Sequence, residues 1–367
     1  MPDSSNPNVG IVTAKKLTAD RFYTALDSDA AELGVSPTFR SIRPRFDIHT
    51  FDCVDSTNTQ LWRMLAAGYG GGTVAIAQRQ SAGRGQRGRV WQSAAGGLYL
   101  SLAVAPDWPV AKAGQLTCLS AWGIAIALNN LGLPIQIKWP NDLFFEGKKL
   151  GGILTETKLA HHSDLASPDL KGSKSLPCIR QAVIGVGINW HNPTPETGIS
   201  LVKILEKFPH GLAKIKINCL ETLSALVLRG ILQGVFFQRQ VGSQVFMKDY
   251  EKLLTQFRKP VSLDRKLLEQ MVFSNRSESR LRTGGLSKSV PLKAERFESD
   301  RSKALLKRQL LGQLVNRSGE VVGVSEEGYL KVALRGPPIE MPYRGSAHWK
   351  VSKRILLFAP ASDTQSV

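Results

Sequence analysis

An uncharged segment from Ala113 to Ile137 limits what this chain can fold into more than any other feature. A stretch of 25 residues without a charged side chain must either cross a membrane or lie in a protein core. It contains Gln115, Asn129, Asn130 and Pro134, whereas a lipid-exposed helix needs almost continuous apolar surface. We therefore expect a buried helix followed by a strand, and no membrane-spanning segment.

The segments around it alternate between strand-like and helix-like patterns. Short apolar runs and alternating residues predict strands, while apolar residues three or four positions apart predict helices. The predicted strands are 46–51, 73–77, 98–105, 135–139, 143–145, 150–157 and 182–188. The predicted helices are 58–68, 116–131, 220–239 and 245–257. This order predicts an α/β domain over residues 46–258.

The remaining residues fall into three predicted regions. Residues 1–45 form an N-terminal extension without the three well-patterned helices that a compact DNA-binding module needs. Residues 259–355 form a small all-β module with strands at 310–316, 321–325, 329–334 and 339–343, and residues 356–367 form a tail. The module is interrupted at 264–308 by 12 basic and 6 acidic residues with little apolar pattern, which predicts a disordered loop. A nucleic-acid-binding or partner-binding arm is the alternative.

Net charge and cysteine content narrow the functional classes. The net charge of +18 predicts attraction to an anionic partner, which could be nucleic acid, a membrane surface, a nucleotide or an acidic protein. The four cysteines lie far apart without a C-x-x-C pair, so neither a disulfide framework nor a zinc site is expected. The polar N-terminus lacks the apolar core of a signal peptide, which favours a cytoplasmic location.

A loop rich in glycine and arginine carries the densest chemical signal. Residues 83–89 read G-R-G-Q-R-G-R and are followed by Trp91 and Ser93. The glycines let backbone amides approach a ligand closely, and the arginines add positive charge around it. The loop lacks the Lys-Ser/Thr ending of a P-loop and the spacing of a dinucleotide site. It therefore favours a phosphate or mixed-anhydride ligand, with a flexible basic surface loop as the alternative.

Three further motifs lie at the ends of predicted strands. K-W-P-N-D at 138–142 ends one strand, and its Asn and Asp could equally be turn formers. K-L-G-G-I-L at 149–154 opens the next strand. Because side chains alternate along a strand, Lys148 and Lys149 should face opposite ways, so at most one enters a pocket. In G-V-G-I-N at 185–189, two glycines expose one strand face, which is costly unless something must approach the backbone.

Taken in order, these motifs resemble those of biotin protein ligases. The series D-S-T-N, G-R-G-x-R-G-R-x-W-x-S, G-L-Y-x-S-L, K-W-P-N-D, K-L-G-G-I-L and G-x-G-I-N covers residues 52–190. The resemblance implies a catalytic domain with a mixed sheet and flanking helices, related to class II aminoacyl-tRNA synthetases and lipoate ligases, followed by an SH3-like barrel. It is closest to the monofunctional type, which lacks an N-terminal DNA-binding domain and would show no specific DNA binding.

The resemblance also implies a role for each matching residue. Residues matching biotin contacts are Ser56, Thr57, Asn58, Gln80, Gly83, Arg84, Gly85, Gln86, Lys149, Gly152 and Gly187. Residues matching contacts to ATP or the adenylate are Trp91, Lys138, Asn141, Asp142 and Asn189. The catalytic cations would be Lys149, Arg84, Arg87 and Arg89. No cage of protein ligands for a metal is expected, and Mg²⁺ would enter with ATP near Asp142.

The implied reaction suits these residue types. Biotin would be activated by ATP to biotinyl-5′-AMP and transferred to a lysine of the biotin carboxyl carrier protein of acetyl-CoA carboxylase. Both reactants of the first step are anionic, so cations and Mg²⁺ would offset their repulsion. The alternatives are a lipoate or octanoate ligase on the same scaffold, which the arginine loop argues against, and a basic nucleic-acid-binding protein. The sequence leaves open whether the chain is a monomer or a homodimer.

Two residues depart from the family pattern. Gln86 stands where many members have arginine, and an uncharged amide there predicts weaker retention of biotinyl-AMP. Ala94 replaces a common proline and should alter only the stiffness of the loop.

Overall fold

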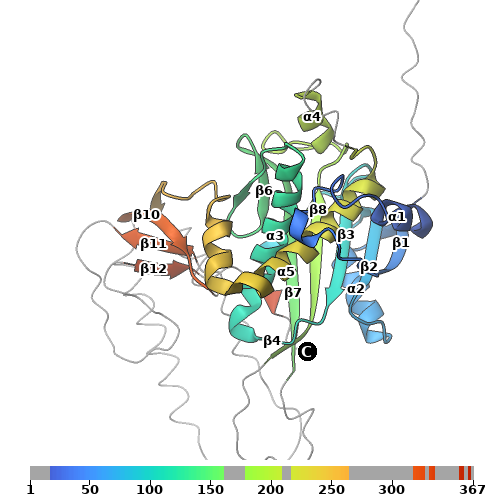
Figure 1. Cartoon of the computed structure of the whole chain (residues 1–367), viewed down its shortest axis with the longest axis horizontal. Coiled ribbons are helices and arrows are strands. Elements are labelled where there is room, and N and C mark those ends of the chain that lie inside the picture. The colour runs from blue at the N-terminus through green and yellow to red at the C-terminus, as the bar shows by residue number, and fades with distance from the viewer. Residues whose placement is uncertain are drawn as a thin grey trace, which may run out of the picture.

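The computed structural model describes residues 17–160, 178–208, 216–263, 317–326, 330–334, 355–358 and 363–364. Within them, a nine-stranded sheet carries helices on both faces, and a separate four-stranded sheet lies at one end (Figure 1). The predicted strands 310–316 and 339–343 and the insertion 264–308 lie outside the described residues.

The large sheet is mixed, as expected. Its central order is β1-β2-β3-β8-β7-β6-β5, with β4 paired to β8 and β13 paired to β7. The β1–β2 and β7–β13 pairs are parallel and the other pairs are antiparallel. The strands are β1 (Asp47–Val54), β2 (Thr73–Gln80), β3 (Leu98–Val104), β4 (Trp108–Pro109), β5 (Gln136–Lys138), β6 (Asp142–Phe145), β7 (Lys148–Ala160), β8 (Cys178–Ile188) and β13 (Asp363–Thr364).

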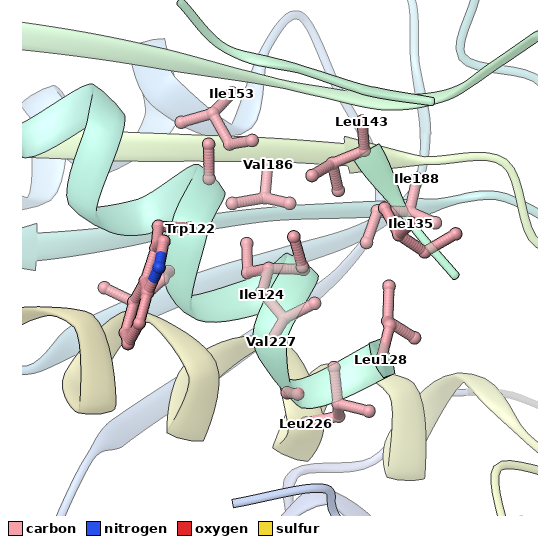
Figure 2. Close-up of a cluster of buried hydrophobic side chains, with 14 of the residues drawn as sticks. Trp122, Ile124, Leu128, Ile135, Leu143, Ile153, Val186, Ile188, Leu226 and Val227 are labelled. Carbon is pink, nitrogen blue, oxygen red and sulfur yellow. The ribbon is translucent and has the colours of Figure 1, made fainter. Parts of the chain in front are cut away.

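Two long helices cover one face of this sheet. Helix α3 (Ala113–Asn130) lies between the sheet and α5 (Leu220–Glu251), and Figure 2 shows Ile124 of α3 between strand residues and the α5 side chains. A Cβ added at Gly123 would lie only 1.9 Å from the carbonyl oxygen of Gly230. Glycine is therefore required where the two helices cross.

The uncharged segment forms the expected buried helix and strand. Helix α3 is almost entirely buried, and β5 follows it. By length and composition, Val110–Asn130 and Leu220–Glu251 could each cross a membrane, but 72% and 67% of their most apolar windows are buried inside the protein. This burial is typical of core helices.

Helix α5 joins two segments that the sequence predicted as separate helices. The two parts meet at Gly242, where φ is +78° and ψ is 166°. This conformation is outside the helical region and is accessible to glycine, which explains the change in periodicity. Helix α5 ends at Glu251, before the predicted end at 257.

Helix α2 covers the opposite face of the sheet, together with the candidate site described below. Helix α2 (Thr57–Ala66) begins after Ser56 and buries Leu61, Met64 and Leu65 against Ala75, Ala103 and Val183 of the sheet. The short helix α4 (Leu201–Glu206), which the sequence did not predict, follows β8.

The described part of the N-terminal extension packs into the main core instead of standing apart. Helix α1 (Ala19–Leu26) and the 3-10 turn η1 (Pro37–Phe39) bury Phe22, Leu26 and Phe39 there. Arg229 of α5 is 5% exposed, and its guanidinium donates to the carbonyl oxygens of Leu26, at 3.0 Å, and Ile42. An arginine in the core thus ties residues 17–45 to the main domain.

Replacing Arg229 with methionine is expected to lower the free energy of unfolding by about 2–4 kcal/mol, because two buried carbonyl groups lose their donors. Urea denaturation would measure the change. Arg239→Met is the matched control, since Arg239 lies on the same helix but is exposed. Equal stability of the two variants would contradict the role given to Arg229.

The smaller sheet is antiparallel and has the order β12-β11-β10-β9. Its strands are β9 (Pro260–Leu263), β10 (Arg317–Val324), β11 (Leu330–Leu334) and β12 (Ile355–Phe358). The sequence did not predict β12, which extends the module past residue 355. The backbone N–H of Val324 donates to the carboxylate of Glu251 at 2.6 Å and so joins this sheet to the end of α5. Closure into an SH3-like barrel stays a prediction.

Candidate functional site

A cavity of about 600 Å³ lies on the face of the large sheet that also carries α2. Strand β8 explains why the cavity is on this face. Ile184, Val186 and Ile188 belong to the core beneath α3, while the alternating positions Gly185 and Gly187 face the other way. Because glycine has no side chain, these two positions leave open space above the sheet on this face.

Most residues that the resemblance assigned to ligands line this one cavity. They are Ser56, Thr57, Asn58, Gln80, Arg84, Gly85, Gln86, Arg87, Arg89, Trp91, Lys138, Asn141, Asp142, Lys149, Gly152 and Gly187. They come from the start of α2, the ends of β2 and β5, the arginine loop, and β6, β7 and β8. Residues separated by more than 100 positions therefore meet in one place.

The glycines of β8 give room to side chains of the protein itself. A Cβ at Gly185 would lie 2.1 Å from Oδ1 of Asn58, and one at Gly187 would lie 2.6 Å from Nε1 of Trp91. The sequence predicted that something approaches this backbone. The structure identifies Asn58 and Trp91 as the side chains that do so.

The arginine loop is closed by hydrogen bonds, although residues 88–90 within it are exposed. Arg84 and Val90 form an isolated antiparallel bridge, and the N–H of Gly85 donates to the carbonyl of Arg89 at 2.7 Å. Arg87 has φ +61° and Gly88 has φ +70°, which reverse the chain. Burial and the neighbouring charge of Arg89 lower the pKa of Arg87, but a guanidinium remains charged in proteins.

The cavity has a strongly positive lining. Its cations are Arg84, Arg87, Arg89, Lys138 and Lys149, while Asp142 is the one carboxylate that lines it in the described part of the chain. Opposing walls of one sign focus the electrostatic field into a cleft. The cavity is therefore suited to a ligand with several negative charges.

Lys149 is the cation of this lining that pairs with Asp142. Its ammonium is 2.7 Å from Oδ1 of Asp142 and 5.3 Å from the centroid of the Trp91 ring. Lys148 lies in a different, smaller cavity of about 240 Å³ beside Lys203 and Lys207. The prediction that only one of the two adjacent lysines enters the pocket is confirmed.

The K-W-P-N-D motif is held by buried hydrogen bonds. The side-chain amide of Asn141 donates to the backbone carbonyl of Ile153 at 2.7 Å. The backbone N–H of Ile153 donates to the backbone carbonyl of Asn141 at 3.0 Å. The hydroxyl of Tyr250 donates to the carbonyl of Pro140 at 2.8 Å, and burial raises its pKa well above the ordinary value, so it remains a donor. These contacts fix Asp142 and Lys138 at the cavity wall.

A polar network forms the other end of the cavity. The backbone N–H and the hydroxyl of Thr57 both donate to Oε1 of Gln80, at 2.8 and 3.2 Å, and the Gln80 amide donates to Oγ of Ser93 at 2.8 Å. The Ser101 hydroxyl lies 2.8 Å from Oγ1 of Thr57 and 2.6 Å from Oδ1 of Asn58. The amides and hydroxyls are thus held in fixed orientations.

Glu156 anchors this network, and the sequence reasoning did not identify it. Its Oε2 accepts hydrogen bonds from Asn58 at 2.8 Å, Trp62 at 3.3 Å and Arg84 at 2.8 Å. Ser101 was also missed. The signal that could have found Glu156 is a carboxylate inside a predicted buried strand, because a charged group is buried only with partners.

Two assigned residues do not line the cavity. A Cβ at Gly83 would lie 2.4 Å from both Oγ of Ser93 and the carbonyl oxygen of Trp91, so Gly83 lies behind the wall. Asn189 is 6% exposed, and its side chain donates to the carbonyl of Lys149 at 3.4 Å and accepts from Asn192. Asn189 thus lies beside the backbone of Lys149 and outside the cavity lining, and its contact with adenine stays a prediction.

The smaller sheet also contributes to the cavity, which the sequence did not predict. Val321 of β10 and Leu330 of β11 line it beside Gln256. In the described residues, no three His, Cys, Asp or Glu side chains come together in a way that could hold a metal ion. The cavity lining thus combines fixed polar groups, five cations and apolar side chains.

Part of this chain is similar to known proteins. Residues 50–167 match the biotin/lipoate A/B protein ligase family. The chain is 32% identical over 212 residues to the bifunctional ligase/repressor BirA of Escherichia coli K12, covering 57% of this chain and 60% of that protein. It is 34% identical over 138 residues to the biotin–[acetyl-CoA-carboxylase] ligase of Paracoccus denitrificans, covering 37% and 51%.

A solved structure has the same fold. The biotin protein ligase from Aquifex aeolicus in complex with biotin and ATP matches with a TM-score of 0.51 and 20% identity, covering 86% of this chain and 97% of that one. The chain thus shares the mixed α/β fold of that structure. Residues 50–167 form a biotin/lipoate A/B protein ligase family domain. The matches to the BirA proteins of Bacillus spizizenii and Bacillus subtilis span 38% and 32% of those proteins.

Proposed function

We propose that this protein is an ATP-dependent biotin protein ligase. The observation that carries the proposal is a single cavity whose lining combines fixed amides and hydroxyls with five cations. The amides and hydroxyls suit the ureido ring of biotin, and the cations suit its carboxylate and the ATP phosphates. The acceptor is the biotin carboxyl carrier protein of acetyl-CoA carboxylase, in keeping with the name of the Paracoccus relative.

The proposed reaction has two steps. An oxygen of the biotin carboxylate attacks the α-phosphorus of ATP, and the bond to the β-phosphate oxygen breaks, which yields biotinyl-5′-AMP and pyrophosphate. The ε-amine of the carrier lysine then attacks the carbonyl of this mixed anhydride. The amide bond forms, AMP leaves, and the amine loses a proton. No nucleophilic side chain of the ligase takes part.

The residues of this chain position the reactants and stabilise charge. Lys149 and Arg84 would hold the biotin carboxylate and the α-phosphate, where negative charge grows in the transition state. Arg87 and Arg89 would meet the other phosphates. Asp142 fits Mg²⁺, which is usually held by one or two carboxylates together with substrate phosphates. When bound, Mg²⁺ would neutralise part of the phosphate charge.

The proposal is tested by incubating the protein with biotin, ATP, Mg²⁺ and a biotin carboxyl carrier domain. Labelled carrier is the expected product, and omission of ATP should abolish it. A carrier domain whose acceptor lysine is replaced by arginine is the matched control. Absence of labelling with the intact carrier would contradict the proposal.

A lipoate or octanoate ligase is the second candidate, because the matched family includes lipoate ligases. The fixed amides and hydroxyls of the cavity favour biotin, since the ring of lipoate has no N–H or C=O that could form hydrogen bonds with them. We expect pyrophosphate release from ATP with biotin and none above background with lipoate. Faster release with lipoate would reverse the assignment.

Gln86 should affect how firmly the adenylate is held. It lines the cavity between Arg84 and Arg87 but carries no charge. We expect Gln86→Arg to slow the escape of biotinyl-AMP by about tenfold, because one charge-assisted hydrogen bond contributes about 1.5–3 kcal/mol. The rate is measured by capture of free adenylate with hydroxylamine. Equal escape from both proteins would contradict the prediction.

A further inference from the structure

Glu156 is a buried carboxylate to which neither the resemblance nor the proposed chemistry gives a role. Its side chain is 2% exposed and lies on β7, opposite Val183 of β8. Three donors meet its Oε2, and the guanidinium of Arg84 is the one cation among them. Buried carboxylates are costly unless paired in this way.

The contacts of Glu156 determine how the amide of Asn58 is oriented. The Asn58 amide nitrogen donates to Glu156 at 2.8 Å and to the carbonyl of Leu154 at 3.3 Å. An amide nitrogen has two hydrogens, and both are therefore committed to protein acceptors. The amide oxygen faces the other way and accepts from Ser101 at 2.6 Å.

This arrangement leaves Asn58 with acceptor capacity only. An amide oxygen has two lone pairs, and Ser101 occupies one of them. Asn58 is 3% exposed, but it lines the cavity together with Gly185, which its amide oxygen faces. A ligand in this part of the cavity that donates a hydrogen bond would use the second lone pair. A reversed amide would bring its oxygen against the Glu156 carboxylate, which accepts but cannot donate when ionised.

We propose that Glu156 is a specificity-determining positioning residue, which fixes Asn58 as an acceptor so that the cavity selects a ligand with a ring N–H donor. This inference rests on the proposed function, because it assigns the ureido N–H of biotin to that acceptor. A site built for such a hydrogen bond rejects ligands that lack the donor. It would thus disfavour a dithiolane ring, which has no N–H.

The test measures the dissociation constant of biotin without ATP, by isothermal titration calorimetry, for three variants. Glu156→Leu removes the acceptor and should weaken binding about 10- to 100-fold, the cost of an unpaired buried group. Glu156→Gln keeps a carbonyl oxygen and should stay within about threefold of wild type, because a neutral acceptor can still orient Asn58. Thr157→Val is the control, since the buried Thr157 hydroxyl has no partner among the described residues.

The outcomes separate this inference from the proposed function. If a folded Glu156→Leu protein binds biotin with the same affinity as the wild-type protein, the positioning role is overturned while the ligase proposal stands. A loss in Glu156→Gln as large as in Glu156→Leu would also overturn it, because charge and not acceptor orientation would then matter. Failure of the wild-type protein to bind biotin would overturn both.

A second pair of variants covers the case in which Glu156→Leu does not fold. Asn58→Asp sets two carboxylates against each other and should lose biotin binding. Adding Glu156→Gln restores a carboxylate–amide pair, with the carboxylate now at position 58 and the amide at position 156. The carboxylate at position 58 can still accept a hydrogen bond from the ligand. We expect the double variant to bind at least about tenfold more tightly than Asn58→Asp alone, as expected for coupled neighbours. No recovery in a folded double variant would overturn the inference.

Discussion

Lys149→Ala is expected to reduce biotin-dependent ATP–pyrophosphate exchange by about 10²- to 10³-fold, the typical cost of removing one aligned group that stabilises transition-state charge. The ammonium belongs to the cationic lining and lies over the Trp91 ring. Its partner in this structure is Asp142, so the alanine variant would also leave a carboxylate without its counter-ion where an anionic ligand must bind. Both effects lower the rate.

The adjacent lysine provides a matched control for this experiment. Lys148 has the same charge and belongs to the same strand, but it lies in the smaller cavity. Lys148→Ala should keep exchange within about twofold of wild type, because surface charges this far from a reaction contribute little. Wild-type exchange in Lys149→Ala, or an equal loss in both variants, would refute the role assigned to Lys149.

Gly185→Ala is the second change with a large expected effect, a loss of biotin binding of about 100-fold. A Cβ at this position would lie 2.1 Å from Oδ1 and 2.9 Å from Cγ of Asn58. The Asn58 side chain is held by Ser101 and Glu156, so it can move only by breaking those hydrogen bonds. A displacement of about 1 Å in a positioned group can cost two orders of magnitude.

Biotin titration and thermal unfolding together test this prediction. The control is Gly70→Ala, because a Cβ at Gly70 has no heavy atom within 4 Å. We expect the control to bind biotin like wild type, and Gly185→Ala to remain folded, since the added methyl group meets a side chain and not the backbone. Unimpaired binding by Gly185→Ala would contradict the geometry assigned to Asn58.

Much of the main fold could be predicted from the sequence because its periodicity is local. The strand and helix segments of residues 46–258 appear in the structure within a few residues of their predicted bounds, apart from the end of α5 and the short α4. Alternation along β7 was enough to separate Lys148 from Lys149. Residues 1–45 lack the well-patterned helices of a compact module, and the attachment of residues 17–45 to α5 depends on Arg229, which is distant in sequence.

The sequence by itself determined the succession of elements, the positive charge of the arginine loop and the motifs that resemble biotin protein ligases. Tertiary structure alone decided which side chains meet. It placed Glu156 beneath Asn58, set the β8 glycines under Asn58 and Trp91, removed Asn189 from the cavity wall and brought Val321 and Leu330 to it. Periodicity is a property of neighbouring residues, whereas a cavity depends on the register between strands that are distant in the chain.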